Sequence, residues 1–121
     1  MMPIDISPEA ARELMEGGAP LAVIDVRRPD EFAFEHIPGA VNIVLDDILE
    51  GRIPAAMADK SALYLLYCRS GRRSGIAARW LSEHGWKRVH NFGGILSWPF
   101  ETTKRAAGKP DQAPSAKESP A

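Results

Sequence analysis

The feature that most constrains the fold is an alternation of short apolar runs with segments of helical spacing. The apolar runs cover residues 21–26, 41–44, 62–68 and 88–92, and helical segments or turns separate them. Strands that alternate with helices are joined by crossover connections, so this order indicates a parallel sheet. We therefore expect an α/β fold with a central, mostly parallel sheet and helices on both faces.

Several elements carry recognisable end signals. Ser7 followed by Pro8 is typical of an N-cap and a first helical position, and a Gly-Gly pair ends that helix at residue 17. Pro29 begins a short second helix with acidic residues in its first turn. The run at residues 62–68 (ALYLLYC) is the most apolar and aromatic, which predicts a central strand. Further helical segments are expected over residues 45–50, 76–84 and 95–101.

One folded domain accounts for most of the chain. The chain has 121 residues, and its end is rich in Ala, Pro, Lys and Ser without an apolar period. A stretch of that composition cannot bury enough apolar surface to order itself. We therefore expect a single domain over residues 1–103, of ordinary domain size, and a disordered tail over residues 104–121.

The charge is nearly balanced overall but unevenly distributed. The net charge is −1, yet residues 1–50 hold 3 Lys or Arg against 11 Asp or Glu, and residues 51–105 hold 10 against 3. A near-neutral total without a basic tract interleaved with aromatic residues argues against nucleic-acid binding. The positive charge concentrates instead around the single cysteine, Cys68.

This cysteine count limits the chemistry and the compartment. One cysteine cannot form an internal disulfide, and the sequence has no CxxC motif or Cys/His cluster that would hold a metal. We therefore expect a cytoplasmic protein without a metal or cofactor. The first fifteen residues carry charges where a signal peptide would be apolar, and residues 62–68 are too short to span a membrane, so we expect no membrane association.

The stretch YCRSGRRSG, residues 67–75, carries the strongest functional signal. Cys68 ends the predicted central strand, and a loop rich in Gly and Arg leads from it into a helix. In open parallel sheets, ligands bind at the carboxyl ends of the strands. A loop that enters a helix there directs several backbone N–H groups toward one point, which stabilises an anion such as a thiolate.

Positive charge beside Cys68 favours the thiolate further. Arg69, Arg72 and Arg73 follow within five residues, and cysteines beside arginine or at helix N-termini have a pKa below the usual value of about 8.5. Gly71 lets the backbone turn tightly. Cys68 is therefore a candidate nucleophile. The alternative is that Cys68 is a buried strand residue and that the arginines belong to a solvated loop.

Three segments together resemble the rhodanese family of sulfurtransferases. They are DVRRPDEFAFEHIPGAVNI (25–43), YCRSGRRSGIAARWL (67–81) and NFGGILSW (91–98), in the family's order and spacing. The resemblance covers essentially residues 4–101 and implies a single-domain rhodanese with a three-layer fold. It also implies a thiosulfate sulfurtransferase: a Cys68 persulfide would carry a sulfane sulfur from thiosulfate or a low-molecular-weight persulfide to a thiophilic acceptor, cyanide or a thiol.

The resemblance also implies which residues form the site. The loop that cradles the persulfide with its backbone N–H groups corresponds to Arg69, Ser70, Gly71, Arg72, Arg73 and Ser74. The three arginines would attract an anionic donor and stabilise the departing group. Asp25 and Arg27 of the DVR element are expected to form an ion pair or hydrogen-bond network near the loop, without taking part in the chemistry.

Other functions stay open at this point. Cysteine phosphatases and arsenate reductases use an anion-binding loop of the pattern Cys-x5-Arg, but the sixth residue after Cys68 is Ser74, and Arg73 comes one position early. The shorter loop favours a compact sulfur over phosphate. Non-catalytic rhodanese-like interaction modules usually lack the cysteine, which is present here. A persulfide carrier whose acceptor is another protein is a further alternative.

Overall fold

Strands and helices alternate along the chain, as the sequence predicts. The fold is given by a computed structural model that describes residues 3–105. In chain order the elements are α1 (Pro8–Glu16), β1 (Ala22–Asp25), α2 (Pro29–Phe34), β2 (Glu35–His36), β3 (Val41–Asn42), α3 (Leu45–Leu49), the 3-10 turn η1 (Ala55–Met57), β4 (Leu63–Cys68), α4 (Arg72–Glu83), β5 (Arg88–Gly94), the 3-10 turn η2 (Ile95–Ser97) and β6 (Thr103–Lys104).

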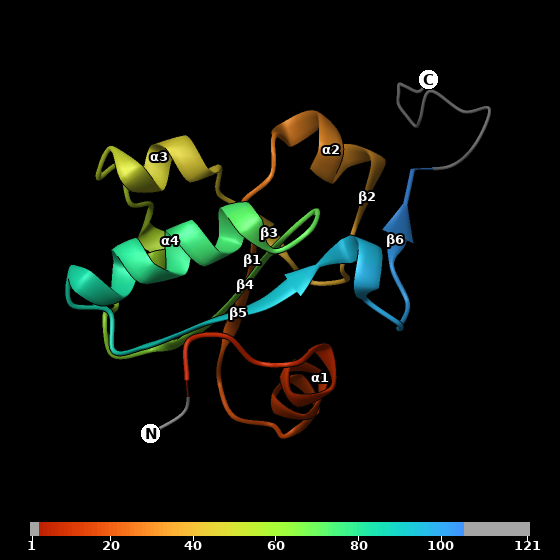
Figure 1. Cartoon of the computed structure of the whole chain (residues 1–121), viewed down its shortest axis with the longest axis horizontal. Helices are drawn as coiled ribbons and strands as arrows, with labels where there is room; N and C mark the ends of the chain where they lie inside the picture. Colours follow the sequence, from red (N-terminus) through yellow and green to blue (C-terminus); the bar gives the residue numbers. More distant parts are fainter. Residues whose placement is uncertain (1–2, 106–121) are drawn as a thin grey trace.

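Four parallel strands form the central sheet in the order β3-β1-β4-β5 (Figure 1). β4 lies between β1 and β5 and all its residues are buried, so its predicted central position is confirmed. Ile24 of β1 aligns with Leu66 of β4, and Asp25 aligns with Tyr67. The carboxyl ends of these two strands therefore share one edge of the sheet, where ligands bind in folds of this class.

Helices cover both faces of this sheet (Figure 1), which confirms the predicted fold class. On one face, Leu81 of α4 belongs to the same buried cluster as Leu66 and Cys68 of β4. On the other face, Ala11 of α1 belongs to a second cluster with Tyr67. Because successive side chains of a strand point to opposite faces, Cys68 points toward the face that α4 covers.

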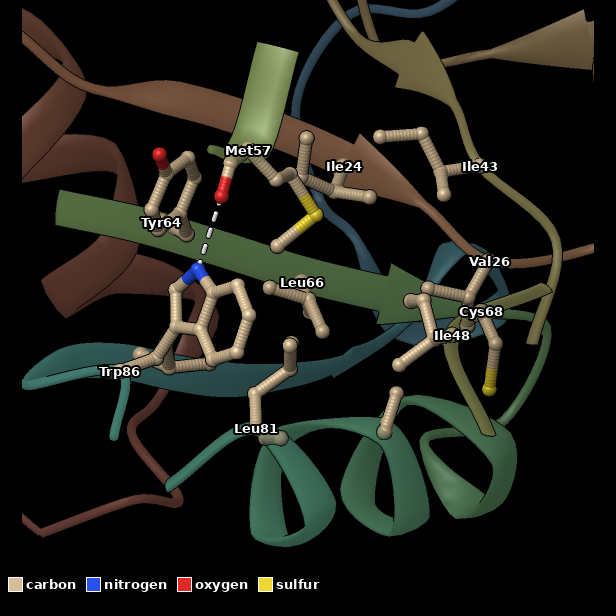
Figure 2. Packing of buried hydrophobic residues seen from close by; sticks show 13 residues of the cluster. Ile24, Val26, Ile43, Ile48, Met57, Tyr64, Leu66, Cys68, Leu81 and Trp86 are labelled. Atoms are coloured by element: carbon tan, nitrogen blue, oxygen red, sulfur yellow. Dashed lines mark hydrogen bonds between the residues drawn. The ribbon is translucent and has the colours of Figure 1, made fainter. Parts of the chain in front are cut away.

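The cluster beneath α4 extends along β4 to Cys68 (Figure 2). Val26 and Ile48 lie at the Cys68 end of this cluster. At its far end, the Trp86 indole donates a hydrogen bond of 2.9 Å to the Met57 carbonyl. Each buried side chain of this size stabilises the fold by about 1.5–3 kcal/mol relative to exposure. The strand end that carries Cys68 is therefore held by packing on several sides.

Most helix ends fall where the sequence predicts them. Ser7 accepts a hydrogen bond from the Ala10 amide at 3.0 Å and caps α1, and α2 begins at Pro29. α4 begins at Arg72, four residues before the predicted start, because its first turn is polar and carries no apolar period. Gly71 precedes it with φ of 101°, a conformation that favours glycine.

The strands differ from the predicted ranges mainly at their ends. β3 stops at Asn42 because Val44 is already the N-cap of α3, and β5 extends to Gly94. β2 and β6 form a separate antiparallel pair that the sequence did not predict. The predicted tail begins at residue 104, but Lys104 belongs to β6 and pairs with Glu35, so this boundary is placed too early. The rest of that tail, 106–121, lies outside the described residues.

The N-terminal segment runs alongside the outer edge of β5, which the sequence also did not predict. The Asn91 amide donates to the Ile4 carbonyl at 2.7 Å, and the Ile6 amide donates to the Asn91 carbonyl at 2.9 Å. Asp5 and Asn91 are therefore bridged in parallel. This isolated bridge involves too few residues to leave a periodic pattern in the sequence.

Candidate active site

Cys68 is the last residue of β4, and residues 69–71 join it to α4. Figure 2 shows its sulfur directed toward the ribbon of α4, and the residue is only 1% exposed. The Gly71 amide donates to Sγ at 3.0 Å, and the Ser74 hydroxyl lies 3.4 Å from the same atom. Ser70 and Arg69 are exposed on the outside of the turn. The loop thus curls around the sulfur with the geometry of an anion-binding site.

Two opposed influences set the pKa of Cys68. Burial is the largest and raises the pKa, because it removes water from the charged sulfur. The Ser74 hydroxyl and the backbone N–H groups of Ser74, Gly71 and Ser70 favour the thiolate. Together these donors outweigh burial and hold the pKa of Cys68 below its ordinary value. The thiolate is the nucleophilic form of cysteine, so the site favours nucleophilic chemistry.

The loop rests directly on the backbone at the end of β5. A Cβ atom on Gly71 would lie 3.1 Å from the Cα of Gly93, and one on Gly94 would lie 2.0 Å from the Arg69 carbonyl oxygen. The Leu96 amide donates to that same carbonyl at 3.2 Å. Gly71 of the loop and Gly94 of β5 therefore allow this close approach, and Gly94 belongs to the site. In the sequence, Gly94 stands out only as part of the segment at residues 91–98.

The structure separates the three arginines of the loop. Arg73 forms a two-point ion pair with Glu31 of α2, at 3.0 Å and 3.2 Å. This pairing holds the pKa of Glu31 at about 2. Arg69 and Arg72 are exposed, and within residues 3–105 neither forms an ion pair. The three arginines therefore differ in their surroundings: Glu31 pairs with Arg73, although the charge of Arg73 still interacts with the Cys68 thiolate.

Asn91 of β5 is a part of the site that the sequence analysis missed. Its Oδ1 accepts from the Ser74 hydroxyl at 2.7 Å and from the Gly93 amide at 3.0 Å. Its Nδ2 donates to the Gly71 carbonyl at 3.3 Å and to the Asp5 carboxylate at 3.0 Å. One signal pointed to this region: His90 and Asn91 are polar residues within a predicted strand, and buried polar side chains require hydrogen-bond partners.

Asp25 and Arg27 form a buried ion pair at the end of β1. Their side chains meet at 2.8 Å and are 0% and 6% exposed, respectively. The guanidinium also donates to the Glu35 carbonyl, and burial together with Asp25 raises the pKa of the neighbouring Tyr67. Within the described residues, neither side chain of the pair hydrogen-bonds to residues 68–74. The expected ion pair is therefore present, one strand away from the loop.

Two further observations apply to residues 3–105 only. In this part of the chain no three His, Cys, Asp or Glu side chains lie together so that they could hold a metal ion. Nor does it contain a helix with the length and apolar character needed to cross a membrane.

Comparison with known proteins identifies the family. The family model described as Rhodanese-like domain matches residues 7–99. Thiosulfate sulfurtransferase PspE of Escherichia coli (strain K12) is 46% identical over 72 residues, 60% of this chain and 68% of that protein. Putative sulfurtransferase YtwF of Bacillus subtilis (strain 168) is 40% identical over 98 residues, 81% of this chain and 92% of that protein.

A solved structure gives the same answer. The structure titled "rhodanese with anions from E. coli" is 40% identical in sequence, has a TM-score of 0.63 and covers 70% of this chain and 99% of its own. The family model and these relatives confirm the resemblance stated from the sequence. The chain therefore belongs to the rhodanese family, and it is a sulfurtransferase of the rhodanese type.

Proposed function

We propose that Cys68 takes a sulfane sulfur from thiosulfate or a low-molecular-weight persulfide, holds it as a persulfide, and passes it to cyanide or a thiol. The observation that carries this proposal is the Gly71 amide at 3.0 Å from Sγ, within a loop whose further donors favour the charged sulfur. The thiolate is already the attacking species in such a loop. The reaction therefore needs no general base.

Two displacements at sulfur complete the transfer. The Cys68 thiolate attacks the outer sulfur of thiosulfate, a new S–S bond forms, and sulfite leaves with the electron pair of the broken S–S bond. The carbon of cyanide then attacks the outer sulfur of the persulfide, thiocyanate leaves, and the thiolate is restored. Negative charge rests on sulfur near the loop in each resting form, where the backbone N–H groups stabilise it.

The burial of Cys68 favours a donor with a slender terminal sulfur. Because Cys68 is 1% exposed, the outer sulfur of the donor has to enter the loop while the bulk of the donor stays outside. Arg69 and Arg72 are the exposed cations of the loop and would hold an anionic donor group at its mouth. Arg73 is paired with Glu31 and contributes less to this attraction.

Steady-state kinetics test this proposal. Thiocyanate formation from thiosulfate and cyanide should give parallel double-reciprocal lines, because the persulfide forms before the acceptor binds. Cys68→Ser should form no thiocyanate. Intersecting lines, or equal activity in Cys68→Ser, would contradict the mechanism. Hydrolysis of p-nitrophenyl phosphate should be absent, and its presence would favour the phosphatase alternative.

The identity of the sulfur acceptor distinguishes an enzyme that acts on small molecules from a persulfide carrier. Both functions share the loading of Cys68, and the carrier would pass sulfur faster to a protein thiol than to cyanide. Which acceptor is used stays a prediction, as does the cytoplasmic location expected from the cysteine content.

A further inference from the structure

We propose that Asn91 is a positioning residue that holds the Cys68 loop in its sulfur-binding shape from the neighbouring strand. The inference rests on the proposed role of Cys68 as nucleophile. Asn91 is 8% exposed and contacts the loop at two points, Ser74 and the carbonyl of Gly71. It acts through these two residues rather than on the sulfur itself.

The partners of Asn91 fix the orientation of its side-chain amide. The Gly93 N–H can only donate, so the atom 3.0 Å from it is the oxygen. The Gly71 carbonyl and the Asp5 carboxylate accept at 3.3 Å and 3.0 Å, so the atom facing them is the nitrogen. Every donor and acceptor of the amide is therefore used in this one orientation, and a flipped amide would lose these bonds.

Through Gly71, Asn91 fixes the turn at which α4 begins. The Gly71 carbonyl accepts both Asn91 Nδ2 at 3.3 Å and the Gly75 amide at 3.0 Å, the first hydrogen bond of the helix. The amide of the same Gly71 donates to the Cys68 sulfur. A Cβ atom on Gly75 would lie 3.3 Å from Nδ2 of Asn91, a tight contact that glycine avoids. Asn91 thus restrains the residue that directs its N–H at the sulfur.

Through Ser74, Asn91 keeps a hydroxyl group beside the sulfur. Oδ1 of Asn91 can only accept, so the contact of 2.7 Å requires Ser74 to donate its single hydrogen to Asn91. In this arrangement the Ser74 oxygen, 3.4 Å from Sγ, can accept the hydrogen of the Cys68 thiol. When the sulfur is charged, the hydroxyl can turn by rotation about one bond and donate to it. The turned hydroxyl no longer bonds to Oδ1, so Asn91 positions the Ser74 oxygen while the sulfur is protonated, and in the charged state it acts on the loop through Gly71.

Asn91 is also tied to two other parts of the fold. The Asp5 carboxylate that accepts from Nδ2 pairs with Arg79 of α4 at 2.9 Å. The backbone of Asn91 pairs with Ile4 and Ile6 in the N-terminal segment. The side chain is therefore supported from several directions, as a residue that fixes a loop requires.

The pH dependence of Cys68 alkylation by iodoacetamide tests the proposal. Asn91→Ala removes the hydrogen bonds of this side chain to Gly71 and Ser74, so the Gly71 amide is no longer held toward the sulfur and the midpoint of the profile should rise by about one pH unit. The alkylation rate below both midpoints should fall about tenfold, because the thiolate fraction falls by that factor. The midpoint is the readout, since the reactivity of a thiolate also changes with its pKa.

His90→Ala is the matched control. His90 precedes Asn91 in β5, is 6% exposed, and its Nδ1 lies 2.7 Å from the Pro3 carbonyl. Its side chain points to the opposite face of the strand from Asn91. The variant loses a buried hydrogen bond, as Asn91→Ala does, but its alkylation midpoint should stay that of the unaltered protein. Asn91→Asp is the second variant if Asn91→Ala does not fold; its midpoint should also rise, because a carboxylate cannot donate to Gly71 and adds negative charge.

Three results would overturn the proposal. An unchanged midpoint in a folded Asn91 variant would show a role in stability alone. A lowered midpoint would show that Asn91 only competes with the sulfur for the Ser74 hydrogen. An equal rise in His90→Ala would show that any damage to β5 has the same effect. Alkylation requires no sulfur donor, so these results are independent of whether the unaltered protein forms a persulfide from thiosulfate.

Discussion

The carboxyl ends of β1 and β4 lie side by side at one edge of the sheet, yet they carry opposite chemistry. β1 leads into the Asp25–Arg27 pair, in which two buried charges satisfy each other. β4 ends in Cys68, where uncharged hydrogen-bond donors surround one sulfur atom, and the nearby charge of Arg73 interacts with it without a hydrogen bond among the described residues. Paired charges stabilise the fold, whereas unmatched donors stabilise a charge that the reaction requires. The same edge therefore combines a structural anchor with a reactive centre.

The largest expected effect is on stability and comes from removing the Asp25–Arg27 ion pair. Asp25→Asn leaves the Arg27 guanidinium buried without its anion, which should lower the free energy of unfolding by about 3–5 kcal/mol. Urea unfolding measures this loss. The folded fraction of the variant should keep the alkylation midpoint of Cys68, since no hydrogen bond found in residues 3–105 joins the side chains of the pair to residues 68–74. A loss below about 1 kcal/mol, the value for an exposed pair, would contradict the anchor role.

The complementary change acts on the reactive centre. Ser74→Ala removes the hydroxyl donor beside Cys68, so the pKa of Cys68 should rise and kcat/KM for thiosulfate at pH 7 should fall about tenfold or more. Ser82→Ala, at the far end of α4, is the matched control for loss of a serine hydroxyl and should keep full activity. An active Ser74→Ala protein with an unshifted Cys68 would show that the backbone N–H groups alone hold the thiolate.

A smaller effect is expected at the ion pair that joins the two regions. Glu31 has a pKa of about 2, below its ordinary value, so its pairing with Arg73 stabilises the fold at neutral pH. That stability is complete above the unfolded pKa of about 4.5 and is lost as the pH falls through about 2. Because the pair is partly exposed, Glu31→Gln should cost only about 1 kcal/mol at pH 7. Urea unfolding between pH 7 and pH 2 should show this difference shrinking; a constant difference would exclude the charge pair as its cause.

The smallest effect concerns the exposed cations. Arg72→Gln should raise KM for thiosulfate about threefold at low salt and leave kcat nearly unchanged, because an exposed charge attracts the donor without touching the reacting sulfur. Arg88→Gln, an exposed arginine at the other end of β5, removes the same charge away from the site. An equal rise of KM in both variants would indicate a general charge effect and not a donor site at the loop.

Local signals explain why much of this molecule could be predicted from its sequence. The apolar run that became β4, the Ser7 cap of α1 and the glycine before α4 each act within a few residues, so their patterns are readable. The loop around Cys68 could be predicted for the same reason, because the strand, the loop and the helix that form it are contiguous in the sequence. Sequence order alone therefore placed Cys68 at a strand end facing a helix N-terminus.

The missing features are contacts between distant segments. Glu31 meets Arg73 across 42 residues, and no local pattern indicates which carboxylate neutralises which arginine. Asn91 contacts Ser74 across 17 residues, and a polar side chain in a strand does not indicate which residue is its hydrogen-bond partner. The β2 and β6 strands have two residues each, too short for a period of alternation. These features depend on packing, which the sequence does not show directly.

The most direct test of the central claim is the intact mass of the protein before and after thiosulfate, and again after cyanide. The account predicts a gain of one sulfur atom, which cyanide removes as thiocyanate and which Cys68→Ser does not show. Failure to gain sulfur from thiosulfate and from glutathione persulfide, in folded protein with an alkylatable Cys68, would contradict the claim that Cys68 carries sulfur.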